Sequence, residues 1–180
     1  MRDKKLRMMT EIGLAVALAV VLNFMTLFRM PQGGSVNLEM LPILIVAIRW
    51  GGIPGMLTGF VYGLVQLALN PYVVHPVQFI LDYPFAYMLL GIAGFIPVKL
   101  KASKKIIVYG TAFIALFLGT FARFISHLLS GAIFFAHFAP EGQNVWLYSS
   151  IYNASFLIPS LLIAFVIIVP LLKTLMKVER

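Results

Sequence analysis

One stretch of the chain combines residue types that could bind a ligand inside a membrane span. It starts at His75, continues through Asp82, Tyr83 and Pro84 to Tyr87, and opens the long apolar run 76–98. A carboxylate in the middle of a transmembrane helix costs about 2.5–3.5 kcal/mol on insertion scales, so an acidic residue there is a candidate functional group. Tyrosine rings attract cations by up to about 2 kcal/mol when water is excluded. The stretch therefore indicates a site for a cationic molecule.

The charge of Asp82 needs a partner from elsewhere, because the lysines of its own run, Lys99 and Lys101, lie at the far end. One alternative is Arg123 of a later apolar run, and the resulting ion pair would join two helices. The other alternative is a cationic ligand. The sequence favours the ligand, and both alternatives remain open at this point.

The composition identifies the class of protein. Of the 180 residues, 61% are hydrophobic and 11% are charged, whereas soluble domains have about 25% charged residues. The chain is therefore predicted to be an all-α, polytopic protein of the lipid bilayer. Its length leaves room for about six spans of about 20 residues each, and we expect a single domain over residues 1–180. The absence of cysteine excludes disulfides and thiolate metal sites.

Six membrane spans are expected. They cover residues 8–28, 38–50, a third stretch that ends near residue 69, and then 76–98, 106–135 and 145–172. The second is short for a bilayer core of about 30 Å, but the charge pattern favours a full crossing. In the third, Gly55, Gly59 and Gly63 recur every four residues, which predicts a face for close helix packing.

The basic residues predict the orientation. With both termini inside, the inner side holds twelve lysines and arginines and the outer side holds only Arg29, while Arg123 lies within a span. The positive-inside rule then places the N and C termini in the cytoplasm. We expect a multi-pass protein of the cytoplasmic membrane. The same placement accounts for the formal charge of +8 without a nucleic-acid partner.

In this orientation, polar and aromatic side chains gather toward the outer side. The residues that share this depth are Glu39, Tyr72, Asp82, Tyr83, His127, Gly131, Phe135, Tyr148 and Asn153. His127, Gly131 and Phe135 are four residues apart and lie on one helix face, where the glycine would leave room for a flat group. Taken singly, the tyrosines also fit an interfacial aromatic belt and Glu39 fits a helix N-terminus. Their common depth favours an outward-open pocket for a small, flat cation with polar edges.

Other classes of function lack their signatures in this sequence. It contains no H-E-x-x-H, no G-x-S-x-G and no glycine motif for nucleotides. We therefore predict that the chain is not an enzyme and has no catalytic residue, no metal site and no cofactor. The sequence also lacks the repeated polar rings of a channel and the inverted repeat of a secondary transporter.

A family resemblance rests on particular motifs. They are the run from Pro31 through Glu39 to Pro42, the triplet at Asp82, His127 four residues before Gly131, and Tyr148 with Asn153 on the last span. Over essentially its whole length, the chain resembles the thiamine-specific S component (ThiT family) of energy-coupling-factor (ECF) ABC transporters. The resemblance implies high-affinity thiamine binding on the outer side of a prokaryotic cell membrane. It also implies a transmembrane coupling subunit and two cytoplasmic ATPase subunits as partners.

The resemblance also implies residue roles. Asp82 stands where the family usually has glutamate, and it would contact the substrate. The aminopyrimidine ring of the substrate would be hydrogen-bonded by His127, Tyr148 and Asn153. The family's aromatic positions are matched by Tyr72 and Tyr83. Phe135 and a first loop without tryptophan depart from the family's stacking residues. The small residues Ala15 and Ala19 resemble the family's docking patch for the coupling subunit.

Two alternatives to a thiamine-binding subunit remain open. The first is an S component for another vitamin. The second is a structural membrane subunit without a ligand, in which Asp82 would pair with Arg123.

Overall fold

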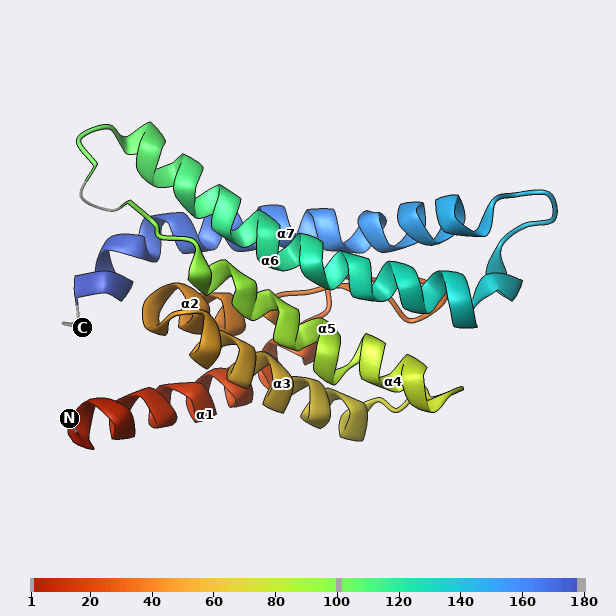
Figure 1. The fold of residues 1–180 in the computed structure, drawn as a ribbon, viewed down its shortest axis with the longest axis horizontal. Helices are drawn as coiled ribbons and strands as arrows, with labels where there is room; N and C mark the ends of the chain where they lie inside the picture. Colours follow the sequence, from red (N-terminus) through yellow and green to blue (C-terminus); the bar gives the residue numbers. More distant parts are fainter. Residues whose placement is uncertain (1, 100–101, 178–180) are drawn as a thin grey trace.

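The structure is a computed structural model that describes residues 2–99 and 102–177, except for the side chains at 173 and 175–177. The α-helices are α1 (Arg2–Phe24), α2 (Met40–Trp50), α3 (Gly52–Leu69), α4 (Pro76–Asp82), α5 (Pro84–Leu89), α6 (Lys105–Phe134) and α7 (Val145–Lys177). Two 3₁₀ helices, η1 (Leu90–Phe95) and η2 (Ala136–Phe138), and two short strands, β1 (Phe28–Arg29) and β2 (Ser35–Val36), complete the fold. Figure 1 shows the helices running roughly along one axis of an elongated bundle.

The expected all-α membrane fold is confirmed. Among the described residues, five segments are long and apolar enough to cross a membrane, namely α1, α3, the segment Pro76–Phe95, α6 and α7. A shorter apolar helix, α2, is the sixth. The start of α1 and the end of α7 lie at the same end of the bundle (Figure 1), as an even number of crossings requires. Which side of the membrane holds that end stays a prediction of the charge pattern. Four basic residues of that pattern are not fully described. Lys101 and Arg180 lie outside the described residues, and the side chains of Lys173 and Lys177 do as well.

The segment that carries Asp82 is not one continuous helix. It breaks at Tyr83, whose φ of −113° and ψ of −91° are not helical, between α4 and α5. Pro84 causes the break, because its ring disfavours a helical conformation at the preceding residue and it has no N–H to donate. The hydroxyl of Ser126 on α6 donates to the carbonyl of Leu81, 2.6 Å away, so α6 satisfies a backbone acceptor beside the break.

The first span also differs from its expected bounds of 8–28. The helix α1 ends at Phe24, and the chain then forms an antiparallel pairing of β1 with β2 in which Phe28 lies opposite Val36. This small hairpin was not expected from the sequence, where Pro31 and the two glycines predicted only a loop. Gly33 has a φ of 95°, a conformation that suits glycine in the turn.

The glycine face of α3 is confirmed as a close-packing face. A Cβ atom on Gly59 would overlap the backbone carbonyl of Tyr87, and one on Gly63 would approach the backbone of Tyr83 and Pro84 to 2.6 Å. The helix α3 therefore lies directly on the broken segment. This contact fixes the position of the segment from which Asp82 projects.

We expect Gly59→Ala to lower the free energy of unfolding by about 1–3 kcal/mol, the cost of overpacking a dense core. The matched control is Gly110→Ala on α6, where a Cβ atom would meet nothing within 4 Å. The measurement is the thermal unfolding midpoint of each variant in detergent. Equal midpoints for the two variants would contradict the close contact between α3 and α5.

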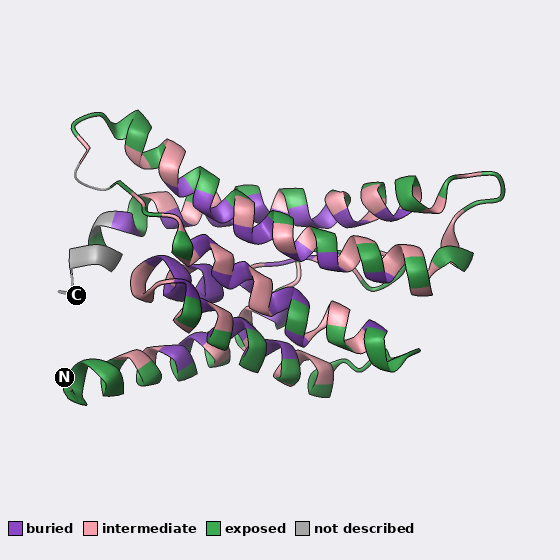
Figure 2. Ribbon diagram, in the orientation of Figure 1, coloured by how far each residue is buried: buried purple, intermediate pink, exposed green. Residues whose placement is uncertain are grey.

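The helix α2 lies at the centre of the bundle. Its residues Ile43, Leu44 and Ala47 are fully buried, and Figure 2 shows the buried residues concentrated around this helix and the segments next to it. Since protein rather than lipid surrounds α2, this 11-residue helix need not match the thickness of the bilayer core alone. The outer faces of the long helices carry exposed large apolar side chains, as expected for surfaces that face lipid.

The burial of Ala15 and Ala19 does not favour the docking role expected for them, and that role stays a prediction. Ala19 is fully buried in the main core, and Ala15 packs with Ile12 and with Val46 of α2. Because α2 occupies this face of α1, no second protein can reach it in this structure. The exposed small residues of α1 are Gly13 and Ala17.

Candidate functional site: a charged, aromatic cavity

A cavity of about 780 Å³ lies between the hairpin, the broken segment, α6 and α7. All nine residues that the sequence singled out for a site line it: Glu39, Tyr72, Asp82, Tyr83, His127, Gly131, Phe135, Tyr148 and Asn153. The structure therefore brings these side chains together around one cavity. Their contact with a ligand stays a prediction.

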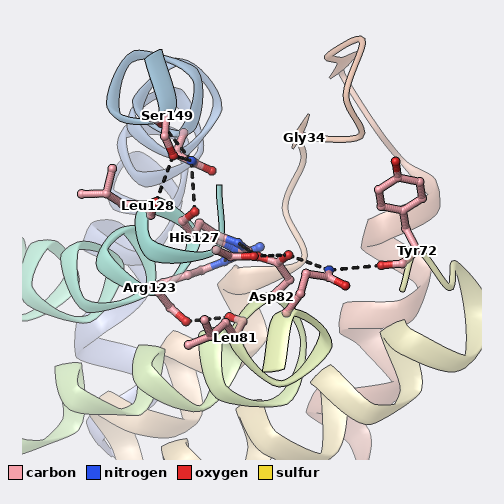
Figure 3. Close-up of polar contacts among 12 residues, drawn as sticks. Gly34, Tyr72, Leu81, Asp82, Arg123, His127, Leu128 and Ser149 are labelled. Carbon is pink, nitrogen blue, oxygen red and sulfur yellow. Dashed lines mark hydrogen bonds and ion pairs between the residues drawn. The ribbon is translucent and has the colours of Figure 1, made fainter. Parts of the chain in front are cut away.

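Asp82 accepts three hydrogen bonds from the protein. Gln78 and Ser130 donate to its Oδ2 at 2.8 and 2.7 Å, and Nδ1 of His127 lies 3.0 Å from its Oδ1. The side chain of Gln78 also donates to the backbone oxygen of Tyr72, 3.1 Å away. Figure 3 shows Asp82 between His127 and Tyr72 in this set of polar contacts. These three contacts of Asp82 fix the position and orientation of the carboxylate. Its side chain is 19% exposed, so the charge borders the cavity.

The neighbours of His127 determine where its ring carries a hydrogen. Nε of Arg123 lies 3.2 Å from Nε2 of His127, and an arginine N–H can only donate. Nε2 therefore accepts, and the hydrogen of the neutral ring lies on Nδ1, from which it is donated to Asp82. Both ring nitrogens are thus used inside the protein. His127 holds Asp82 in place in this structure, and its expected contact with a ligand stays a prediction.

Glu39 is the centre of a buried polar cluster. Asn23 of α1 and Tyr62 of α3 donate to its Oε2 at 2.7 and 2.9 Å. Tyr87 of α5 and Arg123 of α6 donate to its Oε1 at 2.6 and 3.1 Å. The side chains of Glu39 and Arg123 are only 5% and 6% exposed, and the Arg123 guanidinium lies 4.1 Å from the centre of the Tyr87 ring. Five helical segments meet at this one carboxylate.

The ion pair between Asp82 and Arg123 that the sequence left open is not formed. Arg123 turns toward Glu39 at the start of α2, and Asp82 instead contacts His127. The charges of Glu39 and Arg123 compensate each other, and His127 is neutral by the argument above. Asp82 is therefore left as the uncompensated negative charge of the inner cavity, while Arg29, an exposed residue, lines the same cavity from the hairpin.

Aromatic rings line the cavity from two groups of elements. Phe135 stacks on Tyr72 with ring centres 5.8 Å apart and on Phe138 at 6.2 Å. On α7, Tyr148 stacks on Tyr152 at 6.3 Å, and Tyr152 meets Phe156 edge to face at 5.9 Å. Flat faces of this kind favour planar or cationic ligands.

The hairpin between α1 and α2 is fixed to α7 beside the cavity. The backbone N–H of Gly34 donates to the hydroxyl of Tyr152 at 2.9 Å, and a Cβ atom at position 34 would lie 2.7 Å from the ring of Phe156. Tyr83 secures another loop, because its hydroxyl accepts from the backbone N–H of Tyr72 and donates to the carbonyl of Asn70, both at 2.9 Å.

Some residues have positions that the sequence did not indicate. The space beside Gly131 is filled by Ser149, whose Oγ would overlap a Cβ atom there. Gly131 therefore lets α6 and α7 approach rather than leaving room for a flat ligand. His75 does not line the cavity; its Nδ1 accepts from the backbone N–H of Val77, and its ring stacks on Phe134.

Among the polar residues of the cavity that sequence reasoning missed are Asn23, Gln66 and Gln78. For two of them, the sequence contained a feature that indicates a site. Gln78 precedes Asp82 by four residues, a spacing that places two side chains on one helix face. Asn23 is a lone amide near the end of an apolar helix. A polar side chain within a membrane span is costly, as it is for Asp82, and is therefore a candidate functional group.

Within the described residues, no three histidine or acidic side chains are grouped closely enough to hold a metal ion. The inner part of the cavity provides the uncompensated negative charge of Asp82, and the lining adds aromatic faces, hydroxyls and amides. This set supports reversible binding of a small cation.

Comparisons with known proteins identify the family. Residues 9–180 match the family model described as thiamine transporter protein. The chain is 39% identical over 182 residues to the thiamine transporter ThiT of Bacillus subtilis (strain 168), which covers 96% of this chain and 94% of that protein. It is 32% identical over 175 residues to the thiamine transporter ThiT of Lacticaseibacillus paracasei, covering 93% and 87%. The chain therefore belongs to the thiamine transporter family, and the resemblance noted in its sequence is confirmed.

The fold agrees with this assignment. A solved structure of ThiT from Listeria monocytogenes superimposes on the chain with a TM-score of 0.84 at 28% identity, covering 95% of this chain and 96% of that one. The likeness extends over the whole bundle, including the elements that line the cavity.

Proposed function

We propose that the chain binds thiamine in this cavity from the outer side of the cell membrane, as the substrate-binding subunit of an ATP-driven importer of the energy-coupling-factor type. The observation that carries the proposal is the uncompensated Asp82 carboxylate at the border of an aromatic cavity. The family to which the chain belongs supports thiamine as the ligand.

The chemistry of thiamine fits the residues of the cavity. Its thiazolium ring carries a fixed positive charge, which the Asp82 carboxylate and the aromatic faces stabilise. Its aminopyrimidine ring is flat and has donor and acceptor edges. Asn153 uses its Nδ2 to donate to the backbone of Ser149 at 2.9 Å, which leaves its amide oxygen as an acceptor for an amino group. A cavity of about 780 Å³ is within the usual range for small-molecule sites.

The energy for uptake has to come from partner subunits, because the sequence contains no motif for nucleotides. We propose that a transmembrane coupling subunit docks on the exposed face of α1, where Gly13 and Ala17 allow a second helix to approach closely. Two cytoplasmic ATPase subunits complete the proposed importer.

Ala17→Trp is expected to leave thiamine binding by the isolated chain unchanged and to reduce thiamine uptake by cells that supply the coupling subunits at least about tenfold, because a large side chain prevents close helix approach. The control is Leu162→Trp, at a half-exposed position on α7. Radiolabelled uptake and binding are measured on the same variants. Normal uptake by Ala17→Trp would place the docking face elsewhere.

The proposed ligand is tested by calorimetric titration of the purified chain with thiamine, with riboflavin and biotin as controls. Neither Trp50 nor Trp146 lines the cavity, so heat and thermal stability are better signals than tryptophan fluorescence. Thiamine at 100 times its dissociation constant should stabilise the fold by about 2.7 kcal/mol. Binding of another vitamin would overturn the choice of ligand, and stabilisation by none of them would favour a structural subunit.

A further inference from the structure

Arg123 connects the buried Glu39 cluster to the carboxylate that borders the cavity. Its NH2 group donates to Glu39 at 3.1 Å, and its Nε donates to His127 at 3.2 Å. The remaining terminal nitrogen, NH1, lies 3.9 Å from the sulfur of Met40. Although Arg123 is among the residues around the cavity, each of its three side-chain nitrogens has a partner within the protein. Any effect that it has on a ligand is therefore transmitted through its neighbours.

We propose that Arg123 is a positioning residue that sets the charge of the binding cavity. Its Nε–H donates a hydrogen bond to Nε2 of His127, which keeps the imidazole neutral with its hydrogen on Nδ1. The negative charge of Asp82 is then available to a cationic ligand. This inference rests on the proposed function above, and it adds a determinant of ligand charge that is not itself in contact with the ligand.

The geometry excludes a protonated ring at this place. An imidazolium carries a hydrogen on each nitrogen, so its Nε2–H would point at the Nε–H of Arg123, and two positive charges would lie in contact in a poorly hydrated site. The other groups that face this cluster are Asp82 from α4, Glu39 directly before α2, and Phe156 from α7, whose ring meets that of His127 edge to face. A protonated His127 would compensate Asp82, and the inner cavity would lose its attraction for cations.

The chain contains an internal reference for this tautomer. The backbone N–H of Val77 donates to Nδ1 of His75 at 3.1 Å, so a neutral His75 carries its hydrogen on Nε2. His127 carries its hydrogen on Nδ1. Nitrogen NMR of the histidine side chains distinguishes these two forms, and opposite tautomers are expected within one sample.

The test uses two variants of the full chain in detergent. Arg123→Lys keeps a positive charge for Glu39 but has no group in the place of Nε to donate to His127. The double variant Glu39→Gln with Arg123→Gln removes both buried charges together, so neither is left unpaired. The matched control is Arg49→Lys, because Arg49 pairs with Glu11 at 2.7 Å and lies outside the cavity.

In both test variants we expect His127 to lose its exclusive Nδ1–H form and thiamine affinity to fall at least about tenfold, the effect of one hydrogen bond to a charged group. Arg49→Lys should change neither. A double-mutant cycle with Asp82→Asn separates positioning from a general structural role. If Arg123 acts through Asp82, Arg123→Lys costs little further affinity once Asp82 is neutral.

Three outcomes would overturn the proposal. They are an Nε2–H form of His127 in the unaltered chain, a changed tautomer with unchanged affinity, and a loss of affinity that adds fully to that of Asp82→Asn. Failure of the unaltered chain to bind thiamine would instead refute the proposed function, and it would remove the ligand-charge role with it. The tautomer itself is measured without a ligand, so the two failures can be told apart.

Discussion

Glu39→Ala is expected to lower the free energy of unfolding by about 3–5 kcal/mol, because removing one partner of a buried ion pair leaves an uncompensated charge in the interior. The charge left behind is Arg123, whose side chain is 6% exposed. Three further donors, from Asn23, Tyr62 and Tyr87, lose their acceptor in the same step. The thermal unfolding midpoint in detergent measures the effect.

Glu11→Ala is the matched control for this prediction. Glu11 also accepts hydrogen bonds from two arginines and a tryptophan, Arg7, Arg49 and Trp50. Its side chain, however, is 26% exposed, and water can solvate the arginines after the carboxylate is removed. We expect a loss of at most about 2 kcal/mol for Glu11→Ala. Equal losses at the two sites would show that the Glu39 cluster is not the main polar link of the bundle.

The sequence predicted the features that depend on composition and spacing. Apolar length located the spans, four-residue glycine spacing located the tight contact of α3, and a common depth gathered nine residues that do line one cavity. These features follow from local rules. A mid-span carboxylate such as Asp82 is also visible without a structure, because its cost in the membrane is high wherever it occurs.

The pairing of the charges could not be predicted in this way. Glu39 and Arg123 are 84 positions apart, and their contact depends on the bend and tilt of α2 and α6 rather than on any spacing. The sequence offered Asp82 and Arg123 as a pair because each lacked another visible partner. The inward face of α1 was likewise ambiguous, since Ala15 and Ala17 are both small, and only the position of α2 distinguishes the buried residue from the exposed one.

Asp82→Asn is expected to weaken thiamine binding by about 2–3 kcal/mol, or about 30- to 150-fold, while the fold is retained. Asparagine has nearly the same shape, and its single side-chain oxygen can still accept from His127, which lies 3.0 Å from Oδ1 of Asp82, while the Ser130 hydroxyl, 2.7 Å from Oδ2, can rotate to accept from the new NH2 group. What is removed is the negative charge, which no other group of the inner cavity replaces. Calorimetric titration of the purified variant measures the loss.

Two comparisons isolate the charge as the cause. Glu141→Gln removes a carboxylate from an exposed loop outside the cavity and should leave thiamine affinity unchanged. An uncharged aminopyrimidine fragment of thiamine should bind the Asp82→Asn variant and the unaltered chain with nearly equal affinity, because it has no cation for Asp82 to stabilise. A loss as large for the fragment as for thiamine would mean that Asp82 acts as a hydrogen-bond acceptor and that the aromatic faces alone hold the cation.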